Sequence, residues 1–440
     1  MSLPILADPP PEEEIMASWR AENPPMVSVC MLAYNHASYI RSSLNSILNQ
    51  KTDFGFEILV HDDASQDDTA AIIKDYAARY PRIIQPILQT KNQHSQGIYP
   101  SVHFNYPRAR LPFVAMCEGD DYWLDQEKLQ LQVDGLQQNP QINLSFHSAL
   151  RVNCEDWDDP DKVFGDYAQQ DGIIPFIDIL HRVRGWVPFA SCMIRQSAKK
   201  HFLAFLQTRP YLTVGDLYFQ FFGALPEGAL YINRPMSVYR FRTAQSWTRR
   251  AGADPTFKAR HELAMMRSYV ELNALTAYVY HHEFNALTLQ RLLWLFNAKP
   301  SLRALPGVAP LEPLNEACQE AIQATLDMLS MRPARYVIFG CASGCERVLR
   351  HVPADKIAAI IDRDHRRVGE RLQGKPIVGT DALRAHSDCD LVVSTIAANR
   401  RTITELTTAA GIPVERIHYL FDGALRIVDD TPIPAEITNP

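Results

Sequence analysis

Residues 113–123 read FVAMCEGDDYW and place an apolar run directly before three carboxylates, those of Glu118, Asp120 and Asp121. The apolar run predicts a strand buried on both faces, as in a parallel sheet covered by helices. Carboxylates this close repel one another unless a positive charge lies among them. Mg²⁺ commonly takes one or two carboxylates together with phosphate oxygens of a substrate. The stretch therefore indicates a site for a divalent cation and a diphosphate; the alternative is an acidic turn that caps a helix from Asp125 onward.

The sequence before this stretch alternates between strand and helix patterns. Val27–Ala33, Glu57–His61 and Ile83–Leu88 are strand candidates, and residues with helical spacing lie between them. Strand, helix, strand in succession predicts a parallel sheet with crossover helices.

Polar residues follow three of the predicted strands, and this convergence is more specific than any one cluster. They are Tyr34-Asn35, Asp62-Asp63 and the acidic run from Glu118 to Asp121. Ligands of open parallel sheets bind outside the carboxyl ends of the strands. A crevice lined in this way has room for a base, a ribose and a diphosphate in sequence.

Composition limits the classes of protein to which the chain can belong. The chain has 440 residues, 46% hydrophobic and 21% charged, with a formal net charge of −6. These values are typical of a soluble globular protein with two or three domains, and they argue against nucleic acid as a partner. No apolar stretch reaches the ~20 residues of a membrane span, and the eight cysteines form no paired framework. We therefore expect a cytoplasmic protein, with peripheral contact at the inner membrane face through the basic and aromatic segment 240–250 as an open alternative.

The strand and helix patterns change along the chain and predict five segments. These are an N-terminal extension (1–25), a first α/β domain (26–250), a helical connector (251–331), a second α/β domain (332–425) and a tail (426–440).

The motifs of the first domain resemble those of the family 2 glycosyltransferases, which have the GT-A fold. Val27 to Asn35 is similar to the family's opening strand and Y-N turn, and residues 61–69, HDDASQDDT, resemble its D-D-G-S-x-D-x-T signature with Ala64 in place of Gly. Residues 117–123 resemble the E-G-D-D-Y-W form of the D-x-D metal motif. Val214 to Asp216 and residues 237–240, SVYR, look like the late G-D and S-V-Y-R elements. The resemblance covers about half of the chain and implies a Rossmann-like, mostly parallel sheet.

The resemblance also implies roles for individual residues on the donor side. Asp120 would ligate Mn²⁺ or Mg²⁺, with Glu118 as a second metal ligand or, like Asp121, as a contact of the ribose. Arg240 would neutralise the diphosphate. The nucleotide base would lie in a pocket formed by Ala33, Tyr34, Asn35, Asp62 and Asp63.

On the acceptor side, Asp216 matches the family's catalytic base, which takes the proton of the acceptor hydroxyl. The alternative for Asp216 is a helix N-cap. A base at this position needs partial desolvation to be effective near neutral pH. Three aromatic residues are candidates for stacking on sugar rings: Trp123, Trp186 and Trp247. A core position is the alternative for each of them.

The second α/β domain carries a different pattern. Residues 340–345, GCASGC, follow a strand, open a helix and precede Asp362 by about twenty residues, as in dinucleotide-binding folds. However, Ala342 and Cys345 occupy the second and third glycine positions, where glycine admits the pyrophosphate and close helix packing. The domain resembles Rossmann-like units of sugar-modifying enzymes, and it favours a scaffold, an oligomerisation surface or a regulatory nucleotide pocket over NAD chemistry.

We therefore expect an inverting, metal-dependent glycosyltransferase of surface-polysaccharide or glycoconjugate synthesis. Its donor would be a UDP or dTDP sugar, and its acceptor a hydroxyl of a glycan, a lipid-linked or a protein acceptor. Two alternatives remain open: a catalytically inactive nucleotide-sugar-binding scaffold, and an NAD-dependent sugar oxidoreductase acting through the C-terminal domain.

Overall fold

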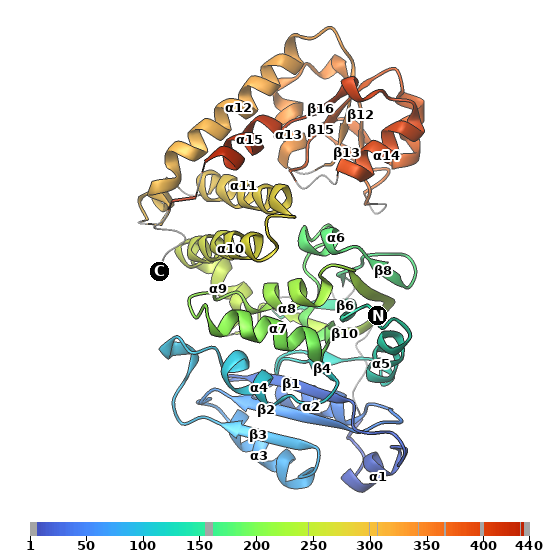
Figure 1. The fold of residues 1–440 in the computed structure, drawn as a ribbon, viewed down its shortest axis with the longest axis vertical. Helices are drawn as coiled ribbons and strands as arrows, with labels where there is room; N and C mark the ends of the chain where they lie inside the picture. Colours follow the sequence, from blue (N-terminus) through green and yellow to red (C-terminus); the bar gives the residue numbers. More distant parts are fainter. Residues whose placement is uncertain are drawn as a thin grey trace. The chain divides into compact units, whose positions relative to one another are not determined.

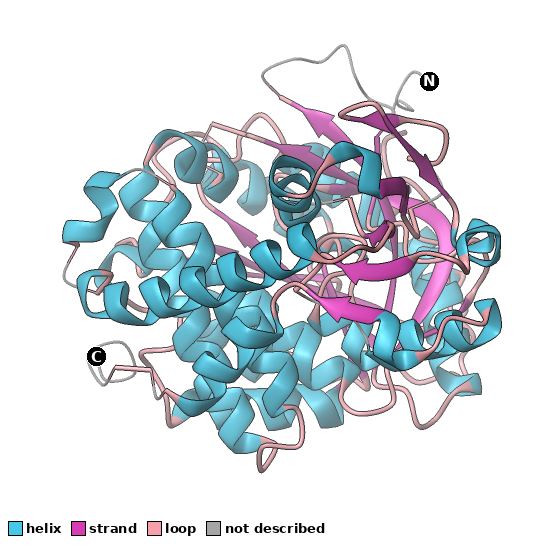
Figure 2. Cartoon of the chain, turned by 90° about the horizontal axis from the view of Figure 1, so that it is seen from above, coloured by secondary structure: helices cyan, strands magenta, loops and turns pink. Residues whose placement is uncertain are grey.

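The computed structural model describes residues 7–154, 162–244, 246–298, 300–305, 307–341, 343–364, 367–396, 400–431 and 433–434 (Figure 1). The chain divides into two compact units, residues 1–254 and residues 255–440. Each unit contains its own sheet, and Figure 2 shows the strands in magenta and the helices in cyan.

The strands of the first unit form one sheet. They are β1 (Val27–Ala33), β2 (Phe56–Asp62), β3 (Ile84–Leu88), β4 (Phe113–Met116), β5 (Tyr122–Trp123), β6 (Leu144–Asn153), β7 (Lys162–Phe164), β8 (Gly172–Ile174), β9 (Met193–Arg195) and β10 (Ala229–Phe241). Their order is β3-β2-β1-β4-β9-β6-β10-β5, with β7 beside β6 and β8 beside β10.

The longer strands of this sheet all run in one direction. β3, β2, β1 and β4 pair parallel, and β10 is parallel to β6. β6 points the same way as β4 because the short β9 is antiparallel to both. The predicted α/β class with a mostly parallel sheet is confirmed.

Helices cover the sheet and supply its core. They are α1 (Glu12–Ala17), α2 (Ile40–Leu48), α3 (Thr69–Arg79), α4 (Tyr106–Arg108), α5 (Lys128–Gln138), α6 (Phe176–Leu180), α7 (Gln196–Gln207), α8 (Gly215–Ala224) and α9 (Trp247–Ala253). Leu44, Ile73 and Leu129 of α2, α3 and α5 belong to one buried cluster with the parallel strands. α7 and α8 lie side by side (Figure 1), joined by the rings of Phe202 and Phe219 at 5.9 Å.

Two irregularities mark the later strands of this sheet. Ser191 N–H donates to the carbonyl of Pro188 at 2.9 Å and closes a turn directly before β9. β10 is one long strand that shifts its register between Ile232 and Ser237. Its long partner is the parallel β6, and it pairs antiparallel only with the short β5 and β8.

The second unit combines long helices with a smaller sheet. Its helices are α10 (Pro255–Leu275), α11 (His281–Asn297), α12 (Glu312–Met331), α13 (Ser343–His351), α14 (Arg400–Ala410) and α15 (Asp422–Asp430). Its strands are β11 (Tyr336–Phe339), β12 (Ile357–Ile361), β13 (Arg371–Leu372), β14 (Lys375–Val378), β15 (Asp390–Val393) and β16 (Ile417–Tyr419), in the order β13-β14-β12-β11-β15-β16. All neighbours pair parallel except β13 and β14.

The helices predicted as a connector share their core with this second sheet. Met266, Leu292 and Ile322, on α10, α11 and α12, belong to one buried cluster with Tyr336 and Ile338 of β11. The helical segment and the sheet therefore form one folded unit. The residues predicted as a tail begin inside α15, and residue 432 and residues 435–440 lie outside the described part of the chain.

Candidate active site

The acidic run forms a tight turn at the carboxyl end of β4. Asp121 N–H donates to the carbonyl of Glu118 at 3.1 Å, which closes a four-residue turn. Gly119 N–H donates to Leu32 of β1 at 2.9 Å, so the turn is fixed to the neighbouring strand. β5 follows and pairs with β10. The carboxylates therefore lie at the strand ends, where parallel sheets bind ligands.

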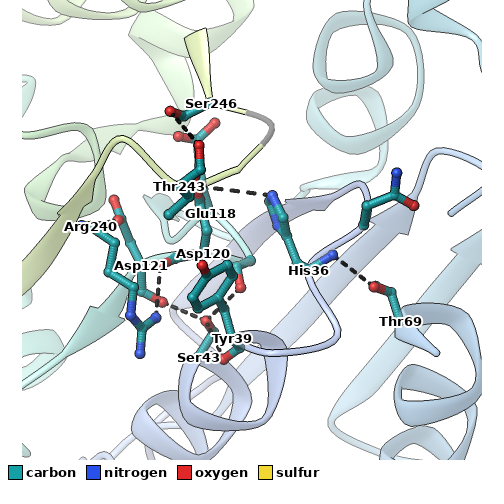
Figure 3. A network of polar contacts seen from close by, with 12 residues as sticks. His36, Tyr39, Ser43, Thr69, Glu118, Asp120, Asp121, Arg240, Thr243 and Ser246 are labelled. Carbon is teal, nitrogen blue, oxygen red and sulfur yellow. Dashed lines mark hydrogen bonds and ion pairs between the residues drawn. The ribbon is translucent and has the colours of Figure 1, made fainter. Parts of the chain in front are cut away.

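Arg240 of β10 holds the acidic turn through two hydrogen bonds (Figure 3), and a third joins Arg240 to α2. Its N–H donates to Asp121 Oδ1 at 2.9 Å, and its guanidinium donates to the carbonyl of Asp120 at 2.7 Å and to Ser42 Oγ at 2.8 Å. The guanidinium also stacks on Tyr122, 4.5 Å from the ring centroid. Arg240 is thus engaged with the turn itself, in addition to the diphosphate role predicted for it.

Asp121 is buried, and Asp120 is the more open of the two aspartates. Burial raises the pKa of Asp121 well above its ordinary value, with Asp120 adding to the shift and the Arg240 N–H opposing it. Asp120 Oδ2 accepts the Thr243 hydroxyl at 2.9 Å, while Oδ1 accepts no hydrogen bond from the described residues. Asp120 therefore keeps one oxygen for a ligand.

Glu118 and Asp216 form an electrostatically linked pair of carboxylates. Burial raises the pKa of Glu118 well above its ordinary value, and the charges of Asp120, Asp216 and Asp121 raise it further. Asp216, in the first turn of α8, is accessible to solvent, yet the surrounding protein desolvates its carboxyl and raises its pKa to about 6, while Arg182 opposes the shift. Val214, the N-cap residue of α8, provides no side-chain cap, and a backbone hydrogen bond of Asp216 itself also opposes the rise of its pKa. A carboxylate of this pKa accepts a proton effectively near neutral pH.

A polar ring connects the ends of β1 and β2. Asn35 N–H donates to Ser65 Oγ at 2.9 Å, and Asn35 Oδ1 accepts Gln66 N–H at 2.7 Å. Both oxygens of Asp62 accept from Ser65, one from its hydroxyl and one from its N–H. Burial raises the pKa of Asp62, and these bonds oppose the shift. The structure therefore brings Asn35 and Asp62 together, next to Ala33 and the partly buried Tyr34.

Asp63 anchors a loop instead of pointing into this ring. Its two carboxylate oxygens accept the N–H groups of Gln93 at 2.7 Å and His94 at 3.1 Å, and its carbonyl accepts Asn92 Nδ2 at 3.0 Å. At the start of α3, Asp67 accepts Thr69 N–H at 3.0 Å, so Asp63 does not cap this helix. Asp62 is therefore the better placed of the two aspartates for a ligand.

The structure separates the three tryptophans predicted for the acceptor side. Trp123 is 1% exposed, donates to the carbonyl of Ala190 at 2.9 Å and has Lys128 Nζ over its ring, so it is a core residue and that prediction is corrected. Trp186 is partly buried, with the Arg182 guanidinium over its ring. Trp247 is 45% exposed at the start of α9.

The carboxylates of the acidic turn suit a divalent cation that is also bound by a substrate. Among the described residues, no three His, Cys, Asp or Glu side chains gather as ligands of one ion. Asp120 and Glu118 provide two carboxylates, and burial, with smaller contributions from the charges of Asp120, Asp216 and Asp121, raises the pKa of Glu118. Two carboxylates completed by phosphate oxygens are a common set for Mg²⁺.

In the second unit, Cys341 of the glycine loop is bonded to Asp362, the acidic residue that follows the next strand. Asp362, at the end of β12, accepts the N–H of Cys341 at 3.1 Å and also its thiol. Arg367 donates to the same sulfur at 2.7 Å. The Asp362 carboxylate is thus bonded to Cys341 of the glycine loop, which gives the NAD alternative no support.

Sequence reasoning missed Thr243, Ser43 and His36, which contact the acidic turn from outside the motifs. Ser43 Oγ of α2 donates to the carbonyl of Gly119 at 2.9 Å. Only the spacing of the Y-N turn before α2 could have drawn attention to His36. No local pattern marks Thr243.

Part of the first unit matches a known protein family. Residues 28–192 match the family model described as glycosyl transferase family 2. This part of the chain belongs to that family. Uncharacterized protein Rv1520 of Mycobacterium tuberculosis is 41% identical over 130 residues, 30% of this chain and 36% of the relative. Chondroitin synthase of Escherichia coli is 27% identical over 144 residues, 33% of this chain and 20% of that protein.

A family 2 glycosyltransferase domain is therefore present, and the chain spans about a third of the length of the first relatives that it matches. The crystal structure of S. aureus TarS 1–349 in complex with UDP-GlcNAc is 17% identical, with a TM-score of 0.47, covering 74% of this chain and 83% of that one. No helix within the described ranges is both long and apolar enough to span a membrane.

Proposed function

We propose that the chain is an inverting glycosyltransferase that moves a sugar from a UDP or dTDP sugar to a hydroxyl of a glycan, lipid-linked or protein acceptor. One observation carries the proposal: an acidic turn at the ends of parallel strands lies within electrostatic reach of Asp216, a carboxylate with a pKa of about 6. The family of residues 28–192 supports the reaction class, and the likeness to a chondroitin synthase supports a role in surface-glycan synthesis.

The residues divide into a donor side and an acceptor side. Ala33, Tyr34, Asn35 and Asp62 would hold the nucleotide base, with Asp63 keeping the neighbouring loop in place. Asp120 and Glu118 would hold Mn²⁺ or Mg²⁺, which offsets the charge that develops on the departing diphosphate. Arg240 orients the acidic turn, and its guanidinium adds positive charge on the same side.

Asp216 would act on the opposite side of the sugar. The acceptor oxygen attacks the anomeric carbon, the bond to the diphosphate breaks, and the acceptor proton passes to the Asp216 carboxylate. Because the incoming and leaving oxygens lie on opposite faces, the anomeric configuration inverts. The raised pKa makes the carboxylate a stronger base than an ordinary aspartate while it stays mostly ionised at pH 7.

A direct test compares donor turnover in three proteins. The wild-type chain, incubated with Mn²⁺ and a panel of UDP and dTDP sugars, should release the nucleoside diphosphate, slowly without acceptor and faster with it. Asp120→Asn should lower this rate by ~100-fold or more, because it removes a negatively charged ligand of the cation. The cation in turn offsets the charge that develops on the departing diphosphate. Asp75→Asn, the same change at an exposed position on α3, serves as the matched control.

The outcomes separate the proposal from its alternatives. Full turnover by Asp120→Asn, or in excess chelator, refutes the metal assignment. Donor binding in a thermal-shift assay without turnover for any donor and acceptor indicates an inactive scaffold. Product of retained configuration by NMR contradicts Asp216 as the base of an inverting reaction.

A further inference from the structure

His36 lies against the acidic turn on the side opposite to Thr243 (Figure 3). Its Nε2 is 3.9 Å from Asp120 Oδ2, the same oxygen that accepts the Thr243 hydroxyl at 2.9 Å. The two side chains come from distant parts of the chain, the loop before α2 and the loop after β10. They flank one carboxylate oxygen and leave the other, Oδ1, without a hydrogen bond from the described residues.

The backbone of His36 is held firmly. Its N–H donates to Thr69 Oγ1 at 2.8 Å, and its carbonyl accepts the N–H groups of Tyr39 and Ile40, each at 2.8 Å. The first bond joins the loop to the start of α3, and the other two begin α2. The backbone from which the imidazole projects is therefore fixed to the starts of two helices.

The ring packs directly on the backbone of the acidic turn. A Cβ added at Gly119 would lie 2.8 Å from Nδ1 of His36, 3.0 Å from Cδ1 of Ile40 and 3.2 Å from Cβ of Ala33. Only glycine therefore lets the ring approach so closely. The side chain of His36 is 15% exposed.

The two ring nitrogens have different surroundings. Nδ1 is buried and has no hydrogen-bond partner among the described residues. A proton on Nδ1 would be a buried donor without an acceptor, which folded proteins rarely tolerate. A proton on Nε2, in contrast, faces the carboxylate of Asp120, whose Oδ2 is 3.9 Å from Nε2.

We propose that His36 is a positioning residue for Asp120, which together with Thr243 confines Oδ2 and directs Oδ1 toward the divalent cation. The inference rests on the metal-dependent reaction proposed above. Residues that orient a metal-ligating side chain commonly change metal affinity ~10–100-fold when they are removed. His36 thus acts on the cation through Asp120 and does not itself touch the substrate.

The test measures Mn²⁺ affinity of the full chain, with and without UDP, from the EPR signal of free Mn²⁺. His36→Phe keeps a ring but removes the donor, and it should weaken binding ~10-fold or more. His36→Gln, whose amide reaches the position of Nε2, should retain most of the affinity, whereas the shorter His36→Asn should not. His103→Phe, at an exposed histidine outside the acidic turn, is the control and should bind as the wild type does.

A double-mutant cycle adds a readout that general loosening of the fold would not reproduce. Because His36 and Thr243 confine the same oxygen, the loss in His36→Phe/Thr243→Val should be smaller than the product of the two single losses. Wild-type Mn²⁺ affinity in both His36→Phe and His36→Asn, or equal losses in His36→Gln and His36→Asn, would overturn the role of His36. A wild-type chain that binds no Mn²⁺ even with UDP would overturn the metal assignment as well, so the two failures are distinguishable.

Discussion

Acidification should slow sugar transfer through the protonation of Asp216. Its pKa is raised to about 6 by desolvation, against the opposing charge of Arg182. A group of this pKa is about nine-tenths ionised at pH 7 and about one-tenth ionised at pH 5. If only the ionised form accepts the acceptor proton, kcat/KM should fall about tenfold over this range. An aspartate of ordinary pKa would lose less than about a tenth of its activity.

The assay is the release of nucleoside diphosphate at pH 5 to 8, with saturating Mn²⁺ and limiting acceptor. The Asp75→Asn control should show the same acid limb as the wild type, and Asp216→Asn should retain donor binding but lose transfer at every pH. A rate that stays constant down to pH 5 in the wild type would refute the assignment of Asp216 as the base.

The same raised pKa has a consequence for stability, with a defined sign. Between pH 4 and pH 6 the folded chain holds a proton on Asp216 more tightly than the unfolded chain does, so this group makes the fold less stable as the pH rises. Asp216→Asn should therefore be more stable than the wild type at pH 7, and the difference should vanish below about pH 4. Because Asp216 is solvent-accessible, screening should keep the gain in the free energy of unfolding below about 1 kcal/mol. Urea unfolding at pH 4 and pH 7 measures it, and a mutant less stable at pH 7 would contradict the desolvation argument.

Three further substitutions test other parts of the site. Arg182→Met removes the positive charge that opposes the shift of Asp216, so the acid limb of the rate profile should move to higher pH, and an unchanged limb would argue against this pairing. Ala64→Gly should stabilise the fold by about 0.5–1 kcal/mol in urea unfolding, because Ala64 has a φ of 60° that glycine adopts without strain, and a destabilised variant would contradict this. Asp63→Asn leaves one of two backbone N–H groups facing an amide donor, so the free energy of unfolding should fall by about 1–3 kcal/mol. Proteolysis near residues 92–98 should become faster, and unchanged cleavage would show that the carboxylate does not anchor that loop.

Much of the site could be predicted because its polar residues follow apolar runs that are easily recognised as strands. Parallel strands bring their carboxyl ends to one edge, and this alone places Asn35, Asp62 and Asp120 near one another. The sequence could not distinguish Asp62 from Asp63. Their difference arises because the loop at residues 92–94 returns to Asp63 for its backbone donors.

Tertiary contacts decided what the local pattern could not. Trp123 directly follows the acidic run, so the sequence pattern made it a candidate for stacking on a sugar ring. Pairing of β5 with β10 instead turns its indole toward Ala190 in the core. The parallel pairing of β10 with β6 could not be predicted from the sequence either. A parallel pair requires a long crossover connection, and the strand pattern does not show where that connection runs. Thr243 and His36 acquire their roles only through contacts with residues far away in the sequence.

The bonds that Arg240 and Thr243 make to the acidic turn cross 119 and 123 positions of the chain. The family match ends at residue 192, well before either residue. A recombinant fragment cut at that boundary would keep every carboxylate of the D-x-D motif and yet lack the strand that gives the motif its shape. Such long-range closure also forms late in folding, since the intervening chain must first be ordered. The acidic turn could therefore close only after residue 243 has left the ribosome, when the first unit of the chain is almost complete.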